Sequence, residues 1–413
     1  MLTQRIIPRY ILISLEEALA DTPVVIIHGP RQCGKSTLAQ IVAAKHGHQY
    51  LSFDDDNLLR AAREDPVGFC TELPIWVVLD EIQRVPELFT SIKTLVDQNR
   101  QPGRFILTGS ANIMLIPKLA DSLAGRMEVI RLAPLTQVEI EQSGLKTSFI
   151  EQLFSGSFSM RPSKRLGDDL IDRLLAGGFP PVLTRSSFKR QRTWQLQYID
   201  ALTLRDIKEL SNIHSLEAIP ELLQAVAGQT ACLVNVSKLA GFFERSRPTI
   251  KAYLTLLEQI FLIEMLPAWH NNRLKRLVKT PKIHITDTGL AGALLGVDKM
   301  KLKKDRTLYG QILESFVNQE LRRQSYWADS TFRFFHYRDK DKVEVDFVIE
   351  KNGKALCGVE VKASSSVNRT DFKGLRRLRT SHDDFICGVV LYDGDKVLPF
   401  GDQFYAVPFN ELW

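Results

Sequence analysis

VVIIHGPRQCGKSTLAQIVAAKHG, residues 24–47, decides the fold of the first part of the chain. Val24 to Ile27 form an apolar, β-branched run of the kind that fills a buried strand. The next residues match G-x-x-x-x-G-K-[ST], and we expect a helix from Thr37 to about Lys45. The backbone N–H groups of such a loop wrap a polyphosphate, and the positive end of the helix points at the same anion. A glycine-rich turn that matches by chance is the alternative, and the order of strand, loop and helix speaks against it.

The loop residues have different expected roles. Lys35 reaches the β- and γ-phosphates, and the Ser36 hydroxyl holds Mg²⁺. Lys35 and the helix N-terminus could lower the pKa of the Cys33 thiol, although Cys33 can also be incidental, because the motif accepts almost any residue there. The residues expected to contact nucleotide are Gly29, Pro30, Arg31, Gln32, Cys33, Gly34, Lys35, Ser36 and Thr37.

Two further apolar runs end in polar residues. Ile75–Leu79 leads directly into Asp80 and Glu81. Open α/β sheets bind ligands at the carboxyl ends of their strands, so Asp80 is expected to hold Mg²⁺ through water and Glu81 to orient or deprotonate the attacking water. A third strand ends in Thr108 and Ser110, either of which could sense the γ-phosphate. Plain strand ends with polar caps are the alternative for both runs.

Four more segments resemble the AAA-type ATPases of bacteria and archaea, which carry a conserved C-terminal region. The segments are FDDDN (53–57), LDEIQRVPELF (79–89), GRFILTGSAN (103–112) and LAGRMEVIRLAPLT (123–136). The resemblance implies ATP and Mg²⁺ as cofactors, ATP hydrolysis, a possible homo-oligomer, and Asp80 with Glu81 as the Walker B pair. It also implies that Arg126 is an arginine finger or senses nucleotide in cis. A surface salt bridge is the other interpretation of Arg126.

Composition sets outer limits on the function. The chain has 413 residues, a net charge of +6 and five cysteines without a C-x-x-C pair. This speaks against a zinc site or a disulfide framework and fits a reducing cytoplasm. The first residues lack a continuous apolar stretch, so we expect a cytoplasmic protein with no membrane partner. The mild positive charge permits a polyanionic partner without requiring one.

Residues 234–269 have the order of a winged helix-turn-helix. We expect Ser237 to cap a short helix, a second helix to begin near Arg247, and a strand over 260–266. The apolar side of the second helix is expected to consist of Ile250, Tyr253, Leu254 and Leu257.

Basic residues gather where such a module would meet DNA. They could contact phosphates, which would make binding depend on salt. The alternative is a winged helix that only packs against the ATPase. The expected DNA-binding residues are Arg245, Arg247 and Lys251 near the second helix, and Arg273, Lys275 and Arg276 in the wing, where Lys279 and Lys282 follow.

VEVDFVIEKNGKALCGVEVKAS, residues 343–364, predicts two strands joined at Asn352-Gly353. Because side chains alternate along a strand, one surface can collect Asp346, Glu360 and Lys362. Two carboxylates can bind Mg²⁺ or Mn²⁺, and a lysine can activate water or stabilise charge on a reacting phosphate.

An acid followed by E-x-K resembles the PD-(D/E)XK nucleases, which often add an acid from a preceding helix. That helix is expected over Leu308–Gln324. Its geometry leaves Glu314 and Glu320 open, and the resemblance to G-x-x-x-E-x-F-V chooses Glu314. Val345 stands where the nominal motif has proline. The implied metal ligands are Glu314, Asp346 and Glu360, and the implied catalytic residues are Asp346, Glu360 and Lys362. A solvated hairpin, or a nuclease fold without activity, are the alternatives.

The sequence therefore predicts an α/β protein. The expected domains are a P-loop ATPase with a parallel sheet (1–140), a linker and helical connector (141–225), a winged helix (226–300) and a smaller restriction-endonuclease-like α/β domain (301–413). The favoured function is an ATPase that engages DNA and carries a possible metal-dependent phosphodiesterase site. The alternative is a nucleotide-switched DNA-binding or protein-interaction regulator whose nuclease-like domain is inactive.

Overall fold

The computed structural model divides into two units, each with its own hydrophobic core. It describes residues 6–110, 123–144, 147–203 and 218–413. Unit 1 comprises Met1–Leu135 and Phe179–Pro181, and unit 2 comprises Thr136–Gly178 and Val182–Trp413. Within the described ranges, no helix is long and apolar enough to cross a membrane.

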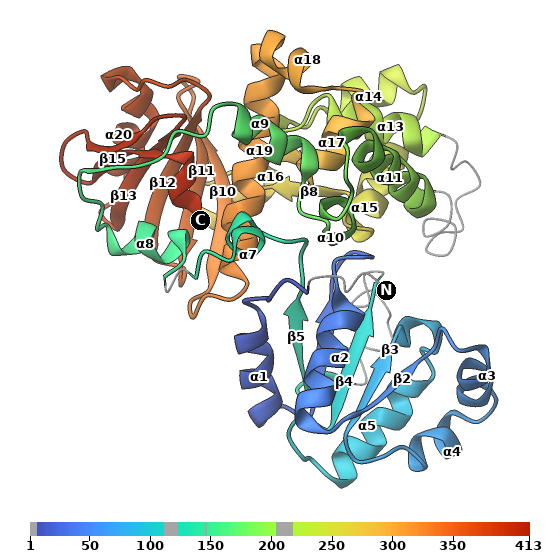
Figure 1. The fold of residues 1–413 in the computed structure, drawn as a ribbon. Coiled ribbons are helices and arrows are strands. Elements are labelled where there is room, and N and C mark those ends of the chain that lie inside the picture. Colours follow the sequence, from blue (N-terminus) through green and yellow to red (C-terminus); the bar gives the residue numbers. More distant parts are fainter. Residues whose placement is uncertain (1–5, 111–122, 145–146, 204–217) are drawn as a thin grey trace. The chain divides into compact units, whose positions relative to one another are not determined.

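Unit 1 is built on a five-stranded sheet in the order β2-β3-β4-β1-β5, and every pairing is parallel (Figure 1). Its strands are β1 (Val24–His28), β2 (Gln49–Ser52), β3 (Val77–Asp80), β4 (Phe105–Gly109) and β5 (Met127–Arg131). Its helical segments are α1 (Leu12–Asp21), α2 (Lys35–His46), α3 (Asp56–Glu64), α4 (Pro66–Thr71), η1 (Ile82–Arg84) and α5 (Leu88–Gln98). All residues of β1, β3 and β4 are buried, as expected for parallel strands covered on both faces. The predicted parallel sheet is confirmed.

The carboxyl ends of these strands meet at one edge of the sheet. β1 leads there into the glycine loop before α2, and β3 ends there at Asp80. Open α/β sheets bind their ligands at this edge.

Unit 2 begins with short helices. The helices in this part of the chain are α7 (Gln137–Glu141), α8 (Phe149–Ser155), α9 (Asp168–Ala176), α10 (Pro180–Leu183) and α11 (Phe188–Ala201). The segment expected as a linker and helical connector, 141–225, contains β6 (Arg161–Pro162), which pairs with β14 (Lys396–Pro399) at the end of a large sheet. Much of the expected connector is therefore part of a folded unit.

A three-stranded antiparallel sheet follows, in the order β7-β9-β8. Its elements are α13 (Ala218–Ala227), β7 (Cys232–Leu233), α14 (Val236–Phe242), α15 (Arg247–Gln259), β8 (Ile263–Leu266), α16 (Arg273–Val278) and β9 (Lys282–Ile285). α15 begins at Arg247 as predicted, with Ser246 as its cap, and the predicted apolar side is buried. Asn235, and not Ser237, caps α14, and the strand begins at Ile263 because Phe261 has a φ of 59°.

A seven-stranded mixed sheet completes unit 2, in the order β10-β11-β12-β13-β15-β14-β6. The strands of this sheet not yet given are β10 (Phe332–Arg338), β11 (Glu344–Lys351), β12 (Ala355–Lys362), β13 (Phe385–Tyr392) and β15 (Phe404–Pro408). The helices in this part of the chain are α17 (Thr288–Leu294), α18 (Lys299–Lys304), α19 (Arg306–Ser325), η4 (Arg369–Phe372), α20 (Lys373–Thr380) and η5 (Phe409–Leu412). β11 and β12 are antiparallel, and Asn352 and Gly353 have φ angles of 52° and 73°. The predicted hairpin is confirmed, because its tight turn needs two residues with positive φ.

Helix α19 joins the two sheets of unit 2. The buried Ser315 hydroxyl lies 2.7 Å from the Thr230 hydroxyl and 3.0 Å from His284 Nδ1. Gln319 donates to the carbonyl of Ile285 in β9 at 3.0 Å. α19 also packs against β12, so this helix connects β9 with the strands of the large sheet.

Glu320 of α19 faces away from those strands. Its Oε2 accepts the N–H of Gln137 at 3.1 Å, at the start of α7. Burial raises the pKa of Glu320 to about 7, although the nearby Arg323 opposes the shift. Glu320 therefore anchors α7, and Glu314 is the acid that α19 directs toward the hairpin.

We expect Glu320→Gln to change how stability depends on pH. The folded pKa lies above the ordinary value of a glutamate, so the folded state holds its proton more tightly than the unfolded state. The stabilisation of the folded state that Glu320 provides is then complete below about pH 4, and it is lost as the pH rises to about 7. In denaturant unfolding, the free energy of unfolding of the variant should rise relative to that of wild type by roughly 2–4 kcal/mol between about pH 4 and pH 7. A constant difference between the two proteins would contradict the assignment.

Candidate nucleotide site and acid cluster

The loop between β1 and α2 has a shape that only its glycines allow. A Cβ on Gly29 would lie 1.9 Å from the carbonyl oxygen of Leu132, and Gly34 has a φ of 104°. Gln32 also has a positive φ, of 58°. The side chain of Arg9 donates to the carbonyls of Cys33 at 2.8 Å and Ala133 at 2.6 Å. The loop is thus fixed by contacts from sequence positions on both sides of it.

Lys35 and Ser36 lie where the motif predicts them. Lys35 is buried, and its Nζ donates to the Pro30 carbonyl at 2.8 Å. The Ser36 hydroxyl lies 3.0 and 3.1 Å from the two carboxylate oxygens of Asp80. Of the other predicted loop residues, Arg31 is partly exposed, and Gln32 and Thr37 are exposed.

Asp80 receives two more hydroxyl groups. Tyr50 donates to Asp80 Oδ2 at 2.7 Å, and Thr108 donates to Oδ1. Burial raises the pKa of the Tyr50 hydroxyl, and its bond to Asp80 adds to the shift. Sequence reasoning missed Tyr50, which lies thirty residues away on β2, and considered Thr108 only as a phosphate sensor.

Glu81 has an uncommon backbone conformation, with φ 57° and ψ 41°. Its N–H donates to the Thr108 hydroxyl at 3.1 Å, and its carboxylate accepts from Gln83 and, at 3.2 Å, from Ser110. The left-handed region costs a residue with a side chain about 1–2 kcal/mol. Ser110, predicted as a nucleotide contact, therefore lies against the acid that is expected to act on water.

Burial shifts the pKa values of two side chains near the loop, His28 and Cys33, toward the neutral form. Burial lowers the pKa of His28 to about 4, and the positive charges of Arg131 and Lys35 add to this shift. Burial raises the pKa of the Cys33 thiol, despite the nearby Lys35. This direction favours the interpretation of Cys33 as incidental, because desolvation of the thiolate outweighs its attraction to the lysine.

Arg126 lies at the other edge of the sheet. It directly precedes β5, and its carbonyl accepts the N–H of Val24 at the start of β1. Its guanidinium is paired with Asp97, with Nε–Oδ1 and Nη2–Oδ2 distances of 2.6 and 2.9 Å. This position does not fit the interpretation of Arg126 as a sensor in cis, and its action across a subunit interface stays a prediction.

The residues present fit a magnesium ion at the nucleotide site. Ser36 and Asp80 bring a hydroxyl and a carboxylate together, and hard oxygen ligands of this kind are what Mg²⁺ prefers. Such an ion would neutralise charge on bound phosphates.

The hairpin acids gather at a second place, in unit 2. Asp346 of β11 accepts the N–H of Val361 at 2.9 Å through Oδ2, and Lys362 donates to Glu360 at 2.9 Å. Lys282 Nζ lies 2.6 Å from Glu314 Oε1 and 3.3 Å from Asp346 Oδ1. The structure thus brings together the four predicted residues and adds Lys282. We call these five residues the acid cluster.

The acid cluster does not fit a divalent metal as it stands. Within the described part of the chain, no group of three or more His, Cys, Asp or Glu side chains is arranged to hold one. Burial lowers the pKa of Lys282, but the carboxylates of Asp346 and Glu314 outweigh this and raise it above its ordinary value. Burial, with Asp346 next, raises the pKa of Glu360 to about 8. In this arrangement the Lys282 ammonium lies between Glu314 and Asp346, the acids that were predicted to bind a metal.

The predicted DNA-binding residues divide into two groups. Arg245, Arg247, Lys251 and Lys275 are exposed. The Arg276 side chain is 11% exposed: it pairs with Glu350 at 3.0 Å and lies over the rings of Trp269 and Phe335, so it does not fit a free phosphate contact. Lys282 is buried, and the segment predicted as the wing contains the helix α16. The side chain of Arg273 lies outside the described residues.

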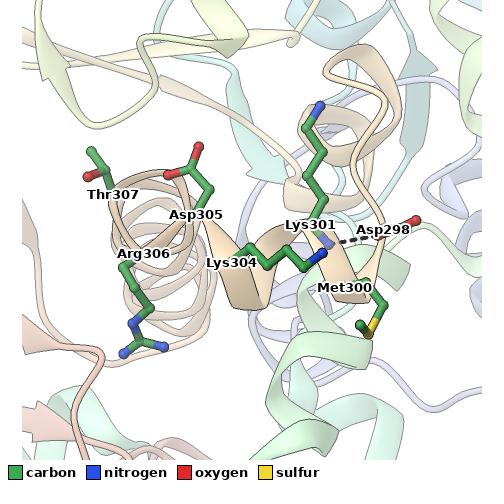
Figure 2. Close-up of a pocket in the computed structure, with 7 residues that line it drawn as sticks. All are labelled: Asp298, Met300, Lys301, Lys304, Asp305, Arg306 and Thr307. Carbon is green, nitrogen blue, oxygen red and sulfur yellow. Dashed lines mark hydrogen bonds between the residues drawn. The ribbon is translucent and has the colours of Figure 1, made fainter.

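A hollow of about 710 Å³ lies beside α18 and the start of α19 (Figure 2). It shares no residue with the nucleotide site or the acid cluster. Its lining residues are Asp298, Met300, Lys301, Lys304, Asp305, Arg306 and Thr307. It is a charged surface feature with no chemistry that connects it to either site.

Three family models match the chain. An AAA domain matches residues 21–141, which contain the nucleotide site. A domain of unknown function (DUF8612) matches residues 167–301, and another (DUF4143) matches residues 309–412. The first match identifies unit 1 as an AAA-type P-loop ATPase domain.

Two proteins match nearly the whole chain. They are an uncharacterized protein of Mycobacterium tuberculosis and one of Mycobacterium bovis, each 30% identical over 403 residues, which is 96% of this chain and 82% of the relative. Among solved structures, a Walker-type ATPase of Pyrococcus abyssi is 17% identical, with a TM-score of 0.44 over 71% of this chain and 97% of its own. The RuvB Holliday junction branch migration motor of Thermotoga maritima is 20% identical, with a TM-score of 0.30 over 63% of this chain and 90% of its own.

We expect Gly29→Ala to weaken ATP binding. The new Cβ must displace the Leu132 backbone, and overpacking of this kind costs roughly 1–3 kcal/mol, which corresponds to about 5- to 150-fold in affinity. Binding of a fluorescent ATP analogue measures the loss. Gly47→Ala is the matched control, because Gly47 has a φ of 74° but nothing within 4 Å of the added Cβ. Wild-type affinity in Gly29→Ala would contradict the proposed cradle.

Proposed function

The chain belongs to the same family as the two mycobacterial proteins, and we propose that it is an ATP-hydrolysing AAA-type ATPase that uses nucleotide to control its contact with DNA. The observation that carries the ATPase part is the contact between Ser36 and Asp80. It joins the two halves of a Mg²⁺-nucleotide site, the glycine loop and the end of β3, through hydrogen bonds of 3.0 and 3.1 Å.

Lys35 is held ready for phosphate. Its ammonium group is buried and donates to a neutral carbonyl, that of Pro30. A phosphate oxygen is a stronger partner, because its negative charge attracts the ammonium group, and water screens this attraction little at a buried site. We expect Lys35 to leave Pro30 for the β- and γ-phosphates when ATP binds.

Glu81 is the residue that we assign to the attacking water. Its carboxylate lies at the carboxyl edge of the sheet, next to Ser110 and Gln83, where a γ-phosphate would lie in this fold. Strained backbone is found most often at functional sites, and the positive φ of Glu81 is such a feature. Thr108 supports both acids, because it donates to Asp80 and accepts from the Glu81 N–H.

The order of elements from α13 to β9 supports the DNA part of the proposal. Helix, strand, two helices and two strands, with the short helix α16 between the last two strands and the sheet order β7-β9-β8, agree with a winged helix. Arg247 and Lys251 are exposed on the first turns of α15, which would be the recognition helix. Duplex DNA is the polyanion that such a helix fits.

Cleavage of DNA by the acid cluster is the second candidate function. The arrangement of α19, β11 and β12 brings Glu314, Asp346, Glu360 and Lys362 together, as in the nuclease interpretation. The ion pairs of Lys282 speak against a metal-loaded cluster in this arrangement. We therefore propose a regulator with a nuclease-like domain that is inactive unless Lys282 leaves.

We expect Glu81→Gln to retain ATP binding and to lose hydrolysis. An amide cannot take a proton from water, and loss of a general base costs roughly 10²-fold or more in rate. Phosphate release measures hydrolysis, and a fluorescent ATP analogue measures binding. Glu87→Gln, in the same segment but outside the site, is the control. Unchanged turnover in Glu81→Gln would remove Glu81 from its assigned role.

We expect the double variant Arg247→Ala/Lys251→Ala to bind duplex DNA more weakly. If both side chains contact phosphates, the slope of log affinity against log salt should fall by about two, since each contact contributes about 0.9. Fluorescence anisotropy over a salt series measures this slope. Lys189→Ala/Arg190→Ala removes the same charge from exposed positions of α11. An equal effect in both double variants would show that net charge, and not α15, governs binding.

A further inference from the structure

Lys282 lies inside the acid cluster, although its strand belongs to the other sheet of unit 2. Its ammonium nitrogen is 2.6 Å from Glu314 Oε1 and 3.3 Å from Asp346 Oδ1. The Lys282 side chain is 8% exposed, and those of Glu314 and Asp346 are each 14% exposed. One cation is therefore held, largely away from water, between acids of α19 and β11.

Other carboxylate oxygens of the acid cluster do not contact Lys282, and they differ in their hydrogen-bond partners. Asp346 Oδ2 is used by the Val361 N–H, and Glu360 Oε1 by Lys362. Glu360 Oε2 is buried and has no hydrogen-bond partner within the described residues. The third acid thus has an unsatisfied oxygen beside the two that hold Lys282. Buried polar atoms of this kind are uncommon, and a bound ion or water is one ordinary explanation.

A divalent metal and the Lys282 ammonium would compete for the same oxygens. Mg²⁺ requires oxygen ligands at about 2.0–2.1 Å in near-octahedral geometry. Glu314 Oε1 and Asp346 Oδ1 already bind an ammonium group at hydrogen-bond distance, which fills the space between them. Two cations on one pair of oxygens would also repel each other in a site that water barely screens.

The backbone of Lys282 is fixed. β9 is the middle strand of its sheet, and Lys282 pairs with Leu233 on one side and Leu266 on the other. The carbonyl of Thr280, two residues earlier, lies 3.0 Å from Nε2 of His336 in β10. The ammonium can therefore leave the acids only if its side chain turns away or if the three-stranded sheet moves as a whole.

We propose that Lys282 is a resident cation of the acid cluster, which occupies the place of a divalent metal and keeps that metal out. Because β9 carries this lysine, a movement of the three-stranded sheet, against which the proposed DNA-binding helix packs, would also open the cluster to a metal. The inference rests on the nuclease-like interpretation of the cluster proposed above, but metal exclusion is measurable without any cleavage.

The test is a Mn²⁺ titration of the full-length protein without nucleotide, in which the electron paramagnetic resonance signal reports free Mn²⁺. Four proteins are compared: wild type, Lys282→Met, Lys282→Arg and Lys282→Met/Asp346→Asn. We expect Lys282→Met to bind one more Mn²⁺ per chain than wild type, with at least about tenfold higher affinity at that site. Lys282→Arg, which keeps the cation, should behave as wild type, and the double variant should lose the added ion. Any Mn²⁺ at the nucleotide site is common to all four proteins.

Two results would overturn the proposal. One is a wild type that binds one more Mn²⁺ per chain than the double variant, because the lysine would then not exclude metal. The other is a folded Lys282→Met that gains no ion.

Removal of the lysine leaves two buried carboxylates close together, so Lys282→Met can fail to fold. Lys282→Gln, which keeps hydrogen-bond donors, is then titrated in its place, and circular dichroism checks its fold. Thermal unfolding adds a second measurement: Mn²⁺ should raise the melting temperature of either neutral variant more than that of wild type. An equal rise in all proteins counts against the proposal.

Cleavage of linear duplex DNA with Mn²⁺ separates this inference from the proposed nuclease-like function. Mn²⁺ bound by Lys282→Met without cleavage would support exclusion by the lysine and reject a phosphodiesterase site. Cleavage that is gained in Lys282→Met and is lost with Asp346→Asn would support both.

Discussion

The pairing of one lysine with two acids links three separate elements of unit 2. Lys282, Glu314 and Asp346 come from β9, α19 and β11, so their ion pairs connect the three-stranded sheet, the long helix and the large sheet. A buried ion pair does not by itself add stability, but removal of one partner leaves a buried charge that costs about 3–5 kcal/mol. The arrangement of these three elements is therefore specific. The same contact decides the chemistry of the cluster, because it uses the oxygens that a metal would need.

The two sites of the chain contrast in this respect. At the nucleotide site, neutral hydroxyl groups of Ser36, Tyr50 and Thr108 surround Asp80, and a hydroxyl can give way to an incoming cation at little cost. At the acid cluster, a full positive charge lies on the acids. The first site is thus prepared for Mg²⁺ with its nucleotide, whereas the second is already neutralised. This difference favours a protein that uses ATP for conformational change and holds its nuclease-like domain inactive.

Much of this could be predicted from sequence, because the decisive patterns are local. The glycine loop, the strand that ends at Asp80 and the hairpin at Asn352-Gly353 each lie within about twenty residues, and periodicity and turn chemistry specify them. The role of Lys282 could not be predicted, since its partners lie 32 and 64 residues away along the chain. In the sequence it is one of several basic residues after α15, and Arg276 looked the same, although it pairs with Glu350, 74 residues away. Nor could helix geometry choose Glu314 over Glu320, because both lie at or near the buried side of α19 and only their distant partners differ.

Anomalous diffraction would test the central claim most directly. Crystals of the full-length protein grown with Mn²⁺ and a non-hydrolysable ATP analogue contain both sites under the same conditions. We predict a manganese peak beside Ser36 and Asp80, which serves as an internal control, and no peak at the acid cluster, with the Lys282 ammonium between Glu314 and Asp346. A manganese peak bound to Glu314 and Asp346, with Lys282 turned away, would contradict the account.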